Sequence, residues 1–402
     1  MSGSPETLTP FPIPDSWEWK KFGDVAHVAS DLVDPAKYRD SVHIAPNHIE
    51  PETGHLLPFK TIAEDGVESP KHRFRAGQIL YSKIRPYLAK VTVPGVPGLC
   101  SADMYPIDTS LVPRYLFRWM LHPQFTAAAS RHEGRNVLPK INKAALSSLP
   151  VPVPPKADQE RIAAVLDQAD ALRVKRRRSI ALLDDLAQSI FVYMFAGDAR
   201  PWPIAAIEDL CSVVVDCVNR TAPVVDEVTP FRMIRTTNVR NGRIDLDDAR
   251  YVNEETFHRW NRRATPRRGD VVFTREAPVG EAGIIETDDP VFLGQRLMLY
   301  RPHPDRSTAA YLATALMSPQ LRAQYEQAGS GSTVKHLSLP TCRGLQVPAP
   351  PVGAQREFEA RVAALQKQKA MHHAHLAALE ELFTSLQQRA FSGTLWDHEA
   401  AT

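Results

Sequence analysis

A tandem repeat constrains this chain of 402 residues more than any other feature. Residues 149–155, with the sequence LPVPVPP, recur as residues 345–351, with the sequence LQVPAPP, at an offset of 196 residues. Each copy is followed by a glutamine, Gln159 or Gln355, and then by a long stretch with helical periodicity. Because a repeat of this length can hold a whole folded unit, the chain is expected to be a duplication with the order head, helix, head, helix.

The match continues upstream with a changing offset. Residues 77–83 (GQILYSK) align with residues 269–275 (GDVVFTR) at an offset of 192, and Trp17 aligns with Trp202 at an offset of 185. A drift of this kind means that a few residues were gained between the matched segments, as surface loops tolerate. The heads have also diverged in composition, which suggests that they perform different versions of one task.

The stretch after each diproline carries apolar residues at alternating spacings of four and three, which are the a and d positions of a coiled coil. These positions are Ile162, Leu166, Ala169, Ile180, Leu183, Ala187, Ile190 and Met194 in the first copy, and Phe358, Val362, Leu365, Leu376, Leu379, Phe383, Leu386 and Ala390 in the second. Each helix is expected to begin after its diproline and to end near Gly197 or Gly393. About 37 residues at ~1.5 Å each give a rod of roughly 55 Å.

Basic residues interrupt both heptad patterns, Arg173 and Arg176 in the first helix and Lys369 and His372 in the second. We predict that the two helices pair as an antiparallel coiled coil, because each helix then returns the chain to the end where the next head begins. Since both interruptions are basic, an acidic partner is expected beside them.

The heads contain short segments of strand composition separated by Gly, Pro and Asn turns. The candidate strands are residues 78–82, 90–93, 233–239, 270–274 and 296–300, with a hairpin turn at Asn241-Gly242, and the candidate helices are residues 113–129 and 307–326. The predicted fold class is α+β, with two tandem heads each followed by a long helix. The predicted division is a flexible tail (1–14), a first head (15–155), a central helix (156–197), a second head (198–351), a C-terminal helix (352–393) and a tail (394–402).

Composition narrows the class of protein. The 48 Lys and Arg residues nearly balance the 46 Asp and Glu residues, so a nucleic-acid binder of this composition has to cluster its basic residues on one surface. The four cysteines form no CxxC pair, which favours a reducing compartment over a zinc site or a disulfide framework. No uninterrupted apolar run approaches the ~20 residues of a membrane span, and the first residues lack the apolar core of a signal peptide. A cytoplasmic protein is therefore expected.

The motifs of several enzyme classes are missing from the sequence. Neither diproline has the Asn/Asp-Pro-Pro-aromatic form that holds a target amine in a methyltransferase, and no Gly-Lys dipeptide offers a phosphate-binding loop. No His, Cys and Asp cluster has the spacing of a metal site. We therefore predict no catalytic residue and no metal ligand, and interpret the chain as a binding protein.

Polar and basic residues gather in a few parts of each head. Residues 232–241 read RMIRTTNVRN, and a polar loop precedes each Pro-rich hinge, RHEGRNVLPK at residues 131–140 and GSGSTVKH at residues 329–336. Arginine forks and asparagine amides suit base edges, while serine, threonine and lysine suit phosphates. For any single residue here, a solvated basic face is the better explanation. For each whole head, DNA contact is the better interpretation.

The hinge and helix segments resemble those of a known family. They read LPVPVPPKADQERIAAVLDQAD and LLDDLAQSIFVYMFAGD in the first copy, and LQVPAPPVGAQREFEARVAAL and LEELFTSLQQRAFSG in the second. With the segments PFRMIRTTNVRNGRIDLDD and RRGDVVFTRE, the layout resembles the specificity subunits of type I restriction–modification systems over residues 13–395. In that family, target-recognition domains alternate with two helices.

The resemblance implies a function for each part. Each head would read one half of a bipartite, asymmetric target in double-stranded DNA, and the helices would set the spacer, with a ~55 Å rod limiting it to roughly 16 base pairs. The helices would also dock two methyltransferase (modification) subunits, and restriction (translocase–nuclease) subunits would join for cleavage. No cofactor is expected on this chain, since S-adenosylmethionine, ATP and Mg would be bound by the partner subunits.

The residues predicted to contact DNA come from the polar segments of the two heads. They are Lys83, Arg85, Arg131, Arg135, Asn136 and Lys140 in the first head, and Arg235, Asn238, Arg275, Gln295, Arg296, Ser332, Thr333, Lys335 and His336 in the second.

Two other hypotheses remain open from the sequence. A protein-binding coiled-coil adaptor without catalytic activity would show no salt-dependent affinity for DNA, whereas a protein that contacts phosphates loses affinity steeply as salt rises. A nuclease with an unrecognised site in one head would cut DNA alone in the presence of magnesium.

Overall fold

The computed structural model describes residues 11–131, 139–196, 202–240, 242–276, 278–328 and 336–396. By their contacts these residues divide into two compact units, and each unit is described by itself. Unit 1 combines Met1–Arg176 with His375–Thr402, and unit 2 comprises Arg177–Ala374. Each unit therefore contains one head together with a part of each long helix.

Unit 1 contains two four-stranded sheets. The main sheet has the order β2-β9-β6-β7, with β2 at Ala26–Val28, β6 at Ile79–Ser82, β7 at Val91–Thr92 and β9 at Met104–Thr109. The second sheet has the order β3-β5-β8-β4, with β3 at Leu32–Val33, β4 at Val42–Ile44, β5 at Lys71–Phe74 and β8 at Gly98–Cys100. Neighbours in both sheets are antiparallel except β4 and β8, which run parallel. A further antiparallel pair joins β1 (Glu18–Lys21) to β10 (Pro150–Val153).

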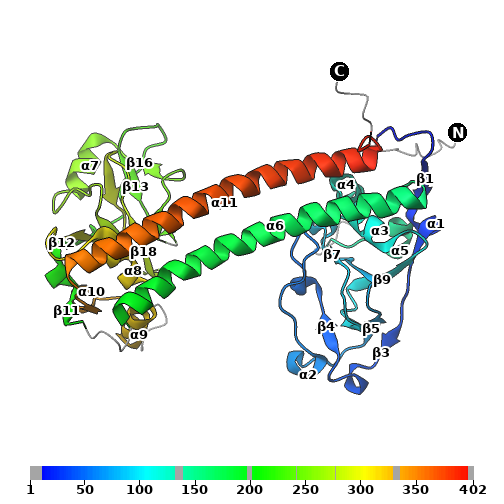
Figure 1. The fold of residues 1–402 in the computed structure, drawn as a ribbon, viewed down its shortest axis with the longest axis horizontal. Coiled ribbons are helices and arrows are strands. Elements are labelled where there is room, and N and C mark those ends of the chain that lie inside the picture. Colours follow the sequence, from blue (N-terminus) through cyan, green and yellow to red (C-terminus); the bar gives the residue numbers. More distant parts are fainter. Residues whose placement is uncertain are drawn as a thin grey trace. The chain divides into compact units, whose positions relative to one another are not determined.

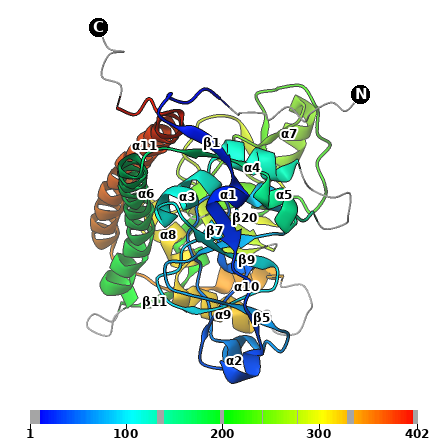
Figure 2. The ribbon, with the colours of Figure 1, turned by 90° about the vertical axis from the view of Figure 1, so that its right-hand side faces the viewer.

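Helices surround one apolar core of unit 1. They are α1 (Phe22–Val25), α3 (Pro113–Met120), α4 (Pro123–Ser130) and α5 (Lys143–Ser147), while α2 (Ile62–Asp65) lies in the connection before β5. Figure 2, in which unit 1 faces the viewer, shows the labels of α1, α3, α4 and α5 near one another, and residues of all four helices belong to this core. Trp119 and Phe125 are fully buried in it, and Phe391 from the C-terminal helix packs at 5.1 Å from the Trp119 ring. Both long helices therefore contribute to this core, while a second cluster that includes Ile44, Phe74 and Met104 belongs to the head alone.

Unit 2 repeats the main sheet of unit 1 and has a smaller second sheet. Its main sheet has the order β12-β20-β17-β18, with β12 at Cys211–Asp216, β17 at Val271–Arg275, β18 at Val279–Ile284 and β20 at Leu297–Pro302. The second sheet has the order β16-β13-β19, with β13 at Arg232–Ile234, β16 at Arg250–Tyr251 and β19 at Val291–Leu293. As β4 and β8 do in unit 1, β13 and β19 run parallel. The antiparallel pair of β11 (Ile204–Ala206) and β21 (Gln346–Pro348) matches β1 and β10. The duplication seen in the sequence is thus a duplication of fold.

The strands on either side of the predicted Asn241-Gly242 turn pair as a hairpin, although Asn241 itself lies outside the described residues. β14 (Val239–Arg240) pairs antiparallel with β15 (Arg243–Ile244), so that Arg240 lies opposite Arg243, and Gly242 has a φ of 80°. The strand expected over residues 233–239 is shorter, because a 3₁₀ turn at Thr236–Asn238 interrupts it. The remaining helices of this head are α7 (Glu254–Trp260), α8 (Ala309–Leu316), α9 (Pro319–Ala328) and α10 (Leu339–Gly344).

The two helices predicted within the heads are each divided in two. Residues 113–129 form α3 and α4, and residues 307–326 form α8 and α9. Each break precedes a proline, Pro123 or Pro319, which begins the next helix because proline lacks the N–H that an interior position donates. His122 caps α4 by accepting the N–H of Gln124. The sequence prediction was wrong here because it followed periodicity across a proline.

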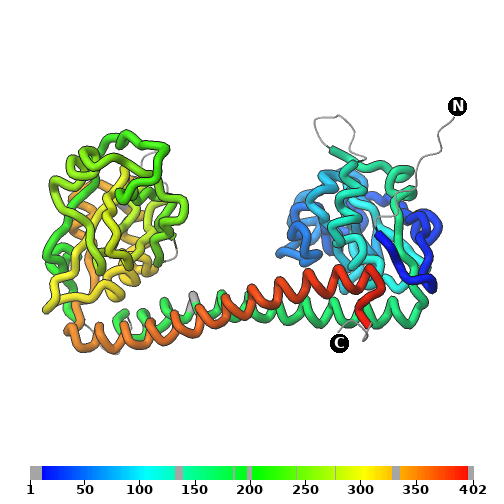
Figure 3. Tube along the Cα trace, turned by 90° about the horizontal axis from the view of Figure 1, so that it is seen from above, coloured from blue at the N-terminus to red at the C-terminus, as the bar shows by residue number. Residues whose placement is uncertain are grey.

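The two long helices begin directly after the Pro-rich hinges. Helix α6 spans Lys156–Phe191 and continues as a π-helix over Val192–Ala196, and α11 spans Val352–Ser392. In unit 1 the beginning of α6 packs beside the end of α11, and in unit 2 the end of α6 packs beside the beginning of α11 (Figures 1 and 3). Phe191 and Phe358, for example, lie 5.8 Å apart in unit 2. All sixteen predicted a and d residues are buried or half-buried, which confirms the antiparallel coiled coil.

The basic interruption in α6 has the acidic partner that the sequence predicted. The Arg173 guanidinium lies 2.5 Å from the Glu380 carboxylate of α11 and 3.2 Å from Asp170 one turn earlier in α6. The guanidinium also stacks at 4.1 Å over the Phe383 ring. A cation at a coiled-coil core position is thus neutralised within unit 1.

Described residues at both chain ends are packed, which differs from the predicted flexible tails. Phe11 packs edge-on against Trp19 at 5.4 Å, and Ile13 contacts the core of unit 1. Near the other end, Leu395 contacts the same core and the Trp396 ring lies 4.1 Å beneath the Arg161 guanidinium. Burial of apolar surface is favourable, and this stabilises the packing of both segments on the unit.

One helix has a stretch that is apolar enough to cross a membrane by length and composition alone. It lies within Lys156–Ala196 and has a mean hydropathy of 1.3 over 18 residues. In unit 2, however, Phe191 and Phe195 of this helix pack against Tyr311 and Phe358 in the protein core. The core helix of a globular unit meets the same criterion, so this feature is weak evidence for a span.

Candidate nucleic-acid interface

A group of cationic side chains lies at one end of the main sheet of unit 1. Strand β6 ends at Ser82, and Lys83 follows directly. A bridge between Ile84 and Lys140 brings the segment that precedes α5 alongside this strand end. The Ile141 N–H donates to the Lys83 carbonyl at 2.9 Å and fixes this arrangement. Two lysines that are 57 residues apart in the sequence therefore lie together.

One carboxylate joins these two lysines. The Nζ atoms of Lys83 and Lys140 lie 3.6 Å and 3.5 Å from the same Oδ1 of Asp103. Lys83 also donates to the Ala102 carbonyl at 2.7 Å. Because two ammonium groups share one carboxylate, the cluster keeps a net positive charge. Flexible, half-exposed ammonium groups of this kind suit contacts to phosphates.

Arg85 occupies a turn beside this cluster with an unusual backbone conformation. Arg85 and Ala89 have φ values of 49° and 44°, a left-handed region that non-glycine residues rarely adopt, and they flank the 3₁₀ turn at Pro86–Leu88. The Arg85 side chain is exposed. Burial, together with the nearby charge of Arg85, lowers the pKa of Lys90. Such strain is retained where surrounding structure enforces it, and it is commonest at functional sites.

Unit 2 carries a different set of side chains at the equivalent place. Glu276 contacts two side chains, since its Oε2 lies 3.3 Å from Nδ1 of His336 and 3.2 Å from Nε of Arg296. The Arg275 guanidinium donates to the Leu337 carbonyl at 3.0 Å and lies 3.0 Å from Nε2 of His336. His336 and Arg296 are half-exposed, so both imidazole and guanidinium are available to a ligand.

The two clusters stand on the same hydrogen-bonded backbone frame. The Lys83 N–H donates to the Asp103 carbonyl at 3.0 Å, and the Arg275 N–H donates to the Arg296 carbonyl at 2.9 Å. The Leu337 N–H donates to the Arg275 carbonyl at 3.2 Å, as the Ile141 N–H does to that of Lys83. The frame therefore pairs four positions between the units: Lys83 with Arg275, Asp103 with Arg296, Lys140 with His336, and Ile141 with Leu337. One frame presents two different sets of polar groups.

Several predicted DNA-contacting residues fall near this frame or outside the described part of the chain. Arg131 is exposed at the C-terminal end of α4. Gln295 is half-buried and precedes Arg296 in the turn before β20. The five predicted residues outside the described residues are Arg135, Asn136, Ser332, Thr333 and Lys335.

Asn238 and Arg235 lie elsewhere in unit 2, and the structure gives them internal roles. Asn238 is only 4% exposed, and its side-chain carbonyl accepts the Arg235 N–H at 2.9 Å. The equivalent residue in unit 1 is His48, whose Nδ1 accepts the Ala45 N–H at 3.2 Å. The Arg235 guanidinium donates to the Asp248 carboxylate at 2.7 Å. A buried amide that closes a turn cannot reach a base edge, so the interpretation of Asn238 as a base contact is not supported.

Arg275 is also better described as a support than as a contact. It is 9% exposed, and its guanidinium is bonded to the backbone and side chain of the segment 336–337. Two carboxylates organise the clusters, those of Asp103 and Glu276, and neither residue was predicted from the sequence. Glu276 directly follows the matched segment GDVVFTR, which is the one signal that pointed to it.

The described residues include no group of three or more His, Cys, Asp or Glu side chains arranged to hold a metal ion. Burial raises the pKa of the Cys100 and Cys211 thiols to about 12 and that of Cys342 to about 11. These thiols are therefore protonated at neutral pH and are weak nucleophiles. What the described clusters offer is recognition of an anionic surface.

Comparison with known proteins connects this geometry to a family. A family model described as Type I restriction modification DNA specificity domain matches residues 14–182. The Type I restriction enzyme EcoDI specificity subunit of Escherichia coli is 48% identical over 204 residues, which cover 50% of this chain and 46% of that subunit. The EcoBI specificity subunit of Escherichia coli is 22% identical over 316 residues, 70% of this chain and 66% of that one. The match therefore spans about half the length of the EcoDI relative.

Solved structures share the fold. A chain from the structure described as "Structural basis underlying complex assembly and conformational transition of the type I R-M system" has a TM-score of 0.60 and 19% identity, and the match covers 96% of this chain and 100% of that one. The type I restriction–modification S subunit from M. genitalium has a TM-score of 0.55 and 12% identity, with 93% and 96% covered. At these identities the likeness concerns the fold alone.

Proposed function

We propose that this chain, which is similar to the specificity subunits of type I restriction–modification systems, is itself such a subunit and recognises a bipartite, asymmetric sequence in double-stranded DNA. Each head binds one half of the target through the cluster at the end of its main sheet. The chain itself carries out no catalysis and selects the site at which partner subunits act.

This proposal rests on one observation: the same backbone hydrogen-bond frame holds different side chains in the two units. Unit 1 presents two lysines around Asp103, whereas unit 2 presents His336 and Arg296 around Glu276. Lysine acts as a point charge, while arginine can bind a guanine edge through two parallel hydrogen bonds. Because the frames match and the polar groups do not, the two halves of the target should differ in sequence.

The long helices serve as the scaffold in this proposal. They set the spacer between the two half-sites and dock two methyltransferase subunits, with restriction subunits joining for cleavage. Apolar side chains on their outer faces are exposed in spite of their size, and these are Leu172, Val174, Leu182, Leu186, Tyr193, Met371 and Leu382. Exposed apolar surface of this kind is typical of a protein interface.

The chemistry belongs to the partners. S-adenosylmethionine would be bound by the methyltransferase subunits, and ATP and Mg by the restriction subunits. Because the substrate is intracellular DNA, the complex would work in the cytoplasm. No cofactor is assigned to this chain.

The test is to co-express the chain with its methyltransferase partner and to map adenine methylation across the host genome by single-molecule sequencing. The expected result is a split motif with two unlike halves and a spacer of fixed length. A stable complex that methylates nothing, and whose affinity for DNA does not fall with salt, would instead favour the protein-binding adaptor.

A further inference from the structure

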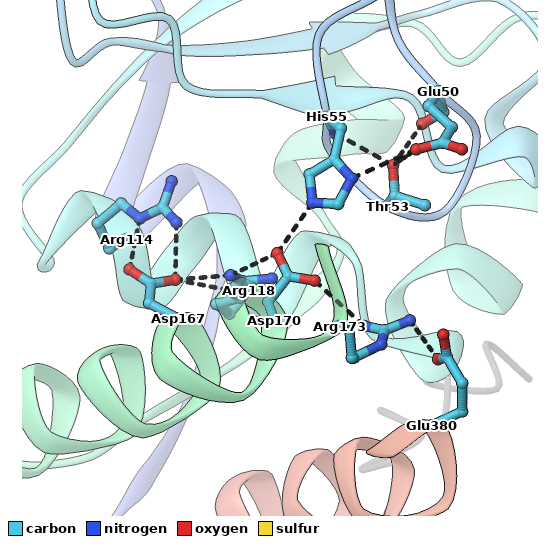
Figure 4. Close-up of polar contacts among 9 residues, drawn as sticks. All are labelled: Glu50, Thr53, His55, Arg114, Arg118, Asp167, Asp170, Arg173 and Glu380. Carbon is cyan, nitrogen blue, oxygen red and sulfur yellow. Dashed lines mark hydrogen bonds and ion pairs between the residues drawn. The ribbon is translucent and has the colours of Figure 1, made fainter. Parts of the chain in front are cut away.

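A network of charged groups joins the first head to both long helices in unit 1 (Figure 4). At its centre is Asp170 on α6, which is 7% exposed. Its carboxylate lies 3.1 Å from the guanidinium of Arg118 on α3, 3.2 Å from that of Arg173 and 3.0 Å from Nε2 of His55. His55 belongs to a loop of the head that is 115 residues away in the sequence. The loop of His55 is therefore docked on α6.

The network extends on both sides of Asp170. On one side, Arg114 contacts Asp167 through two hydrogen bonds of 2.8 Å and 2.7 Å, and Arg118 donates to the same carboxylate at 2.7 Å. On the other side, Arg173 lies 2.5 Å from Glu380 of α11. Within the loop itself, the Glu50 carboxylate lies 3.3 Å from Nδ1 of His55.

Charge balance in this network depends on the protonation of His55. The permanent cations are three guanidinium groups, those of Arg114, Arg118 and Arg173. The carboxylates are four, those of Asp167, Asp170, Glu380 and Glu50. The imidazole of His55, which lies between two of these carboxylates, adds a positive charge to the network when it is protonated.

The geometry of the ring favours its protonated form. A carboxylate oxygen faces each of its nitrogens, Glu50 at Nδ1 and Asp170 at Nε2. A neutral imidazole carries a single N–H, so it can donate to only one of them and must turn a lone pair toward the other. The hydrogen bond to Asp170, followed by that to Glu50, raises the pKa of His55 against the opposing effect of burial. Only the protonated ring satisfies both contacts.

The loop that His55 docks also supports the turn of Arg85. The Glu52 N–H donates to the Leu88 carbonyl at 3.1 Å, and Leu88 ends the 3₁₀ turn that begins after Arg85. Gly54, with a φ of 77°, packs so closely on the Phe117 ring that an added Cβ would lie 2.5 Å from it. The loop is therefore held tightly between α3 and the Arg85 turn, and a release at His55 loosens the support of Arg85.

We propose that His55 is a proton-controlled latch that positions the DNA-contacting turn of the first head. When the imidazolium bridges Glu50 and Asp170, residues 50–55 are held on α6 and the Arg85 turn is fixed. When the ring loses its proton, the loop leaves α6 and the first head binds its half-site more weakly. This inference rests on the proposed function for its effect on DNA, while the latch itself concerns the loop alone.

The second head lacks the latch. The offset of 196 places Ala310, Thr314 and Ala363 where unit 1 has Arg114, Arg118 and Asp167. Gln366 replaces Asp170, and its side-chain carbonyl accepts a hydrogen bond of 2.8 Å from Arg243, which keeps its charge at all relevant pH values. Proton control is thus confined to the first head.

The first experiment measures the loop without DNA. Hydrogen–deuterium exchange of the peptide covering residues 50–57 would be followed in the full chain from pH 6 to 9 and corrected for the intrinsic exchange rate at each pH. The expected result is protection at low pH that is lost as pH rises through the pKa of His55. Protection that does not depend on pH would overturn the proposal.

Two variants and one control sharpen this readout. His55→Gln should abolish the pH dependence, because its amide does not titrate. Glu50→Gln should keep the latch but move its midpoint to lower pH by roughly half a unit, since one carboxylate that favours the imidazolium is removed. His27→Gln replaces an exposed histidine of the same head and should leave the curve unchanged. A midpoint that is the same in Glu50→Gln and in the wild type would contradict the bridging role.

The second experiment uses DNA and separates the two hypotheses. In the complex with the methyltransferase, the ratio of the affinities for the correct and for an altered first half-site should fall about fivefold between pH 6.5 and 8.5. In His55→Gln this ratio should not change with pH. If the loop loses its protection from exchange while this ratio of affinities stays the same, the latch does not position Arg85. That result would overturn the proposed effect on DNA binding. If the complex binds no DNA at all, the proposed function fails, whereas the exchange experiment still decides the latch.

Discussion

Gln159 and Gln355 make the same pair of hydrogen bonds in the two units. The side-chain carbonyl of Gln159 accepts the Val112 N–H at 2.9 Å, and its amide donates to the Pro154 carbonyl at 2.9 Å. Gln355 does the same with Thr308 at 3.0 Å and Pro350 at 2.8 Å. Val112 and Thr308 are the N-cap residues of α3 and α8, so each glutamine ties a Pro-rich hinge to the first helix of its head. One buried amide thus ties each head to the start of its long helix, in addition to the apolar core that they share.

Gln159→Ala is expected to destabilise unit 1 by about 2 kcal/mol, because a buried N–H and a buried carbonyl lose their partners. Urea unfolding of the full chain measures the loss. Gln124→Ala, at an exposed position of α4, is the matched control and should change little. If both substitutions lowered the free energy of unfolding equally, the buried amide of Gln159 would contribute no more to stability than an exposed one.

Replacing Lys83 and Lys140 together by alanine is expected to weaken DNA binding by a similar factor for all sequences. Each lost phosphate contact should also reduce the slope of log affinity against log salt by about one. Fluorescence anisotropy with the methylated motif across a salt series gives this slope. Lys20→Ala, on the exposed face of β1, should leave it unchanged; the same slope in the double variant would remove these lysines from the interface.

Arg296→Gly is expected to relax recognition of only one half of the target. Arg296 has a φ of 69°, which glycine adopts without strain, so the substitution removes the guanidinium and keeps the backbone. Genome methylation mapping should show a less restricted second half and an unchanged first half. A change in both halves would indicate that the heads do not read independently.

Unit 1 is expected to lose stability in acid because of Asp170. Burial opposes ionisation of this carboxylate, but the hydrogen bond from His55 and the charge of Arg118 outweigh it and lower its pKa from 3.8 to about 2. A lowered folded pKa means that the contribution is present above pH ~4 and is lost as pH falls toward 2, by about 2 kcal/mol. Urea unfolding at pH 2 to 5 measures this dependence. Asp170→Asn should flatten it, and an unchanged acid profile in that variant would assign the loss to other groups.

Much of the architecture could be predicted from the sequence because it depends on local chemistry. A diproline cannot lie inside a helix, so the starts of α6 and α11 at Lys156 and Val352 follow from the hinges. The heptad spacing determines which side chains face the partner helix, and these residues are buried or half-buried as expected. The prediction of uninterrupted helices failed at Pro123 and Pro319. The same rule for proline would have placed a helix break before each of these residues.

Contacts between distant segments were decided only by the tertiary structure. Asp103 becomes the partner of Lys140 through the pairing of β6 with β9 and the bridge at Ile84, and none of these follows from spacing along the chain. The docking of His55 on Asp170 depends in the same way on how the first head packs on α6. Repeat offset, periodicity and proline chemistry are properties of neighbouring residues, so the sequence by itself determined the duplication, the helices and the alternation of the parts. Which polar groups meet depends on the packing of whole elements, and that packing set both the cationic clusters and the burial of Asn238.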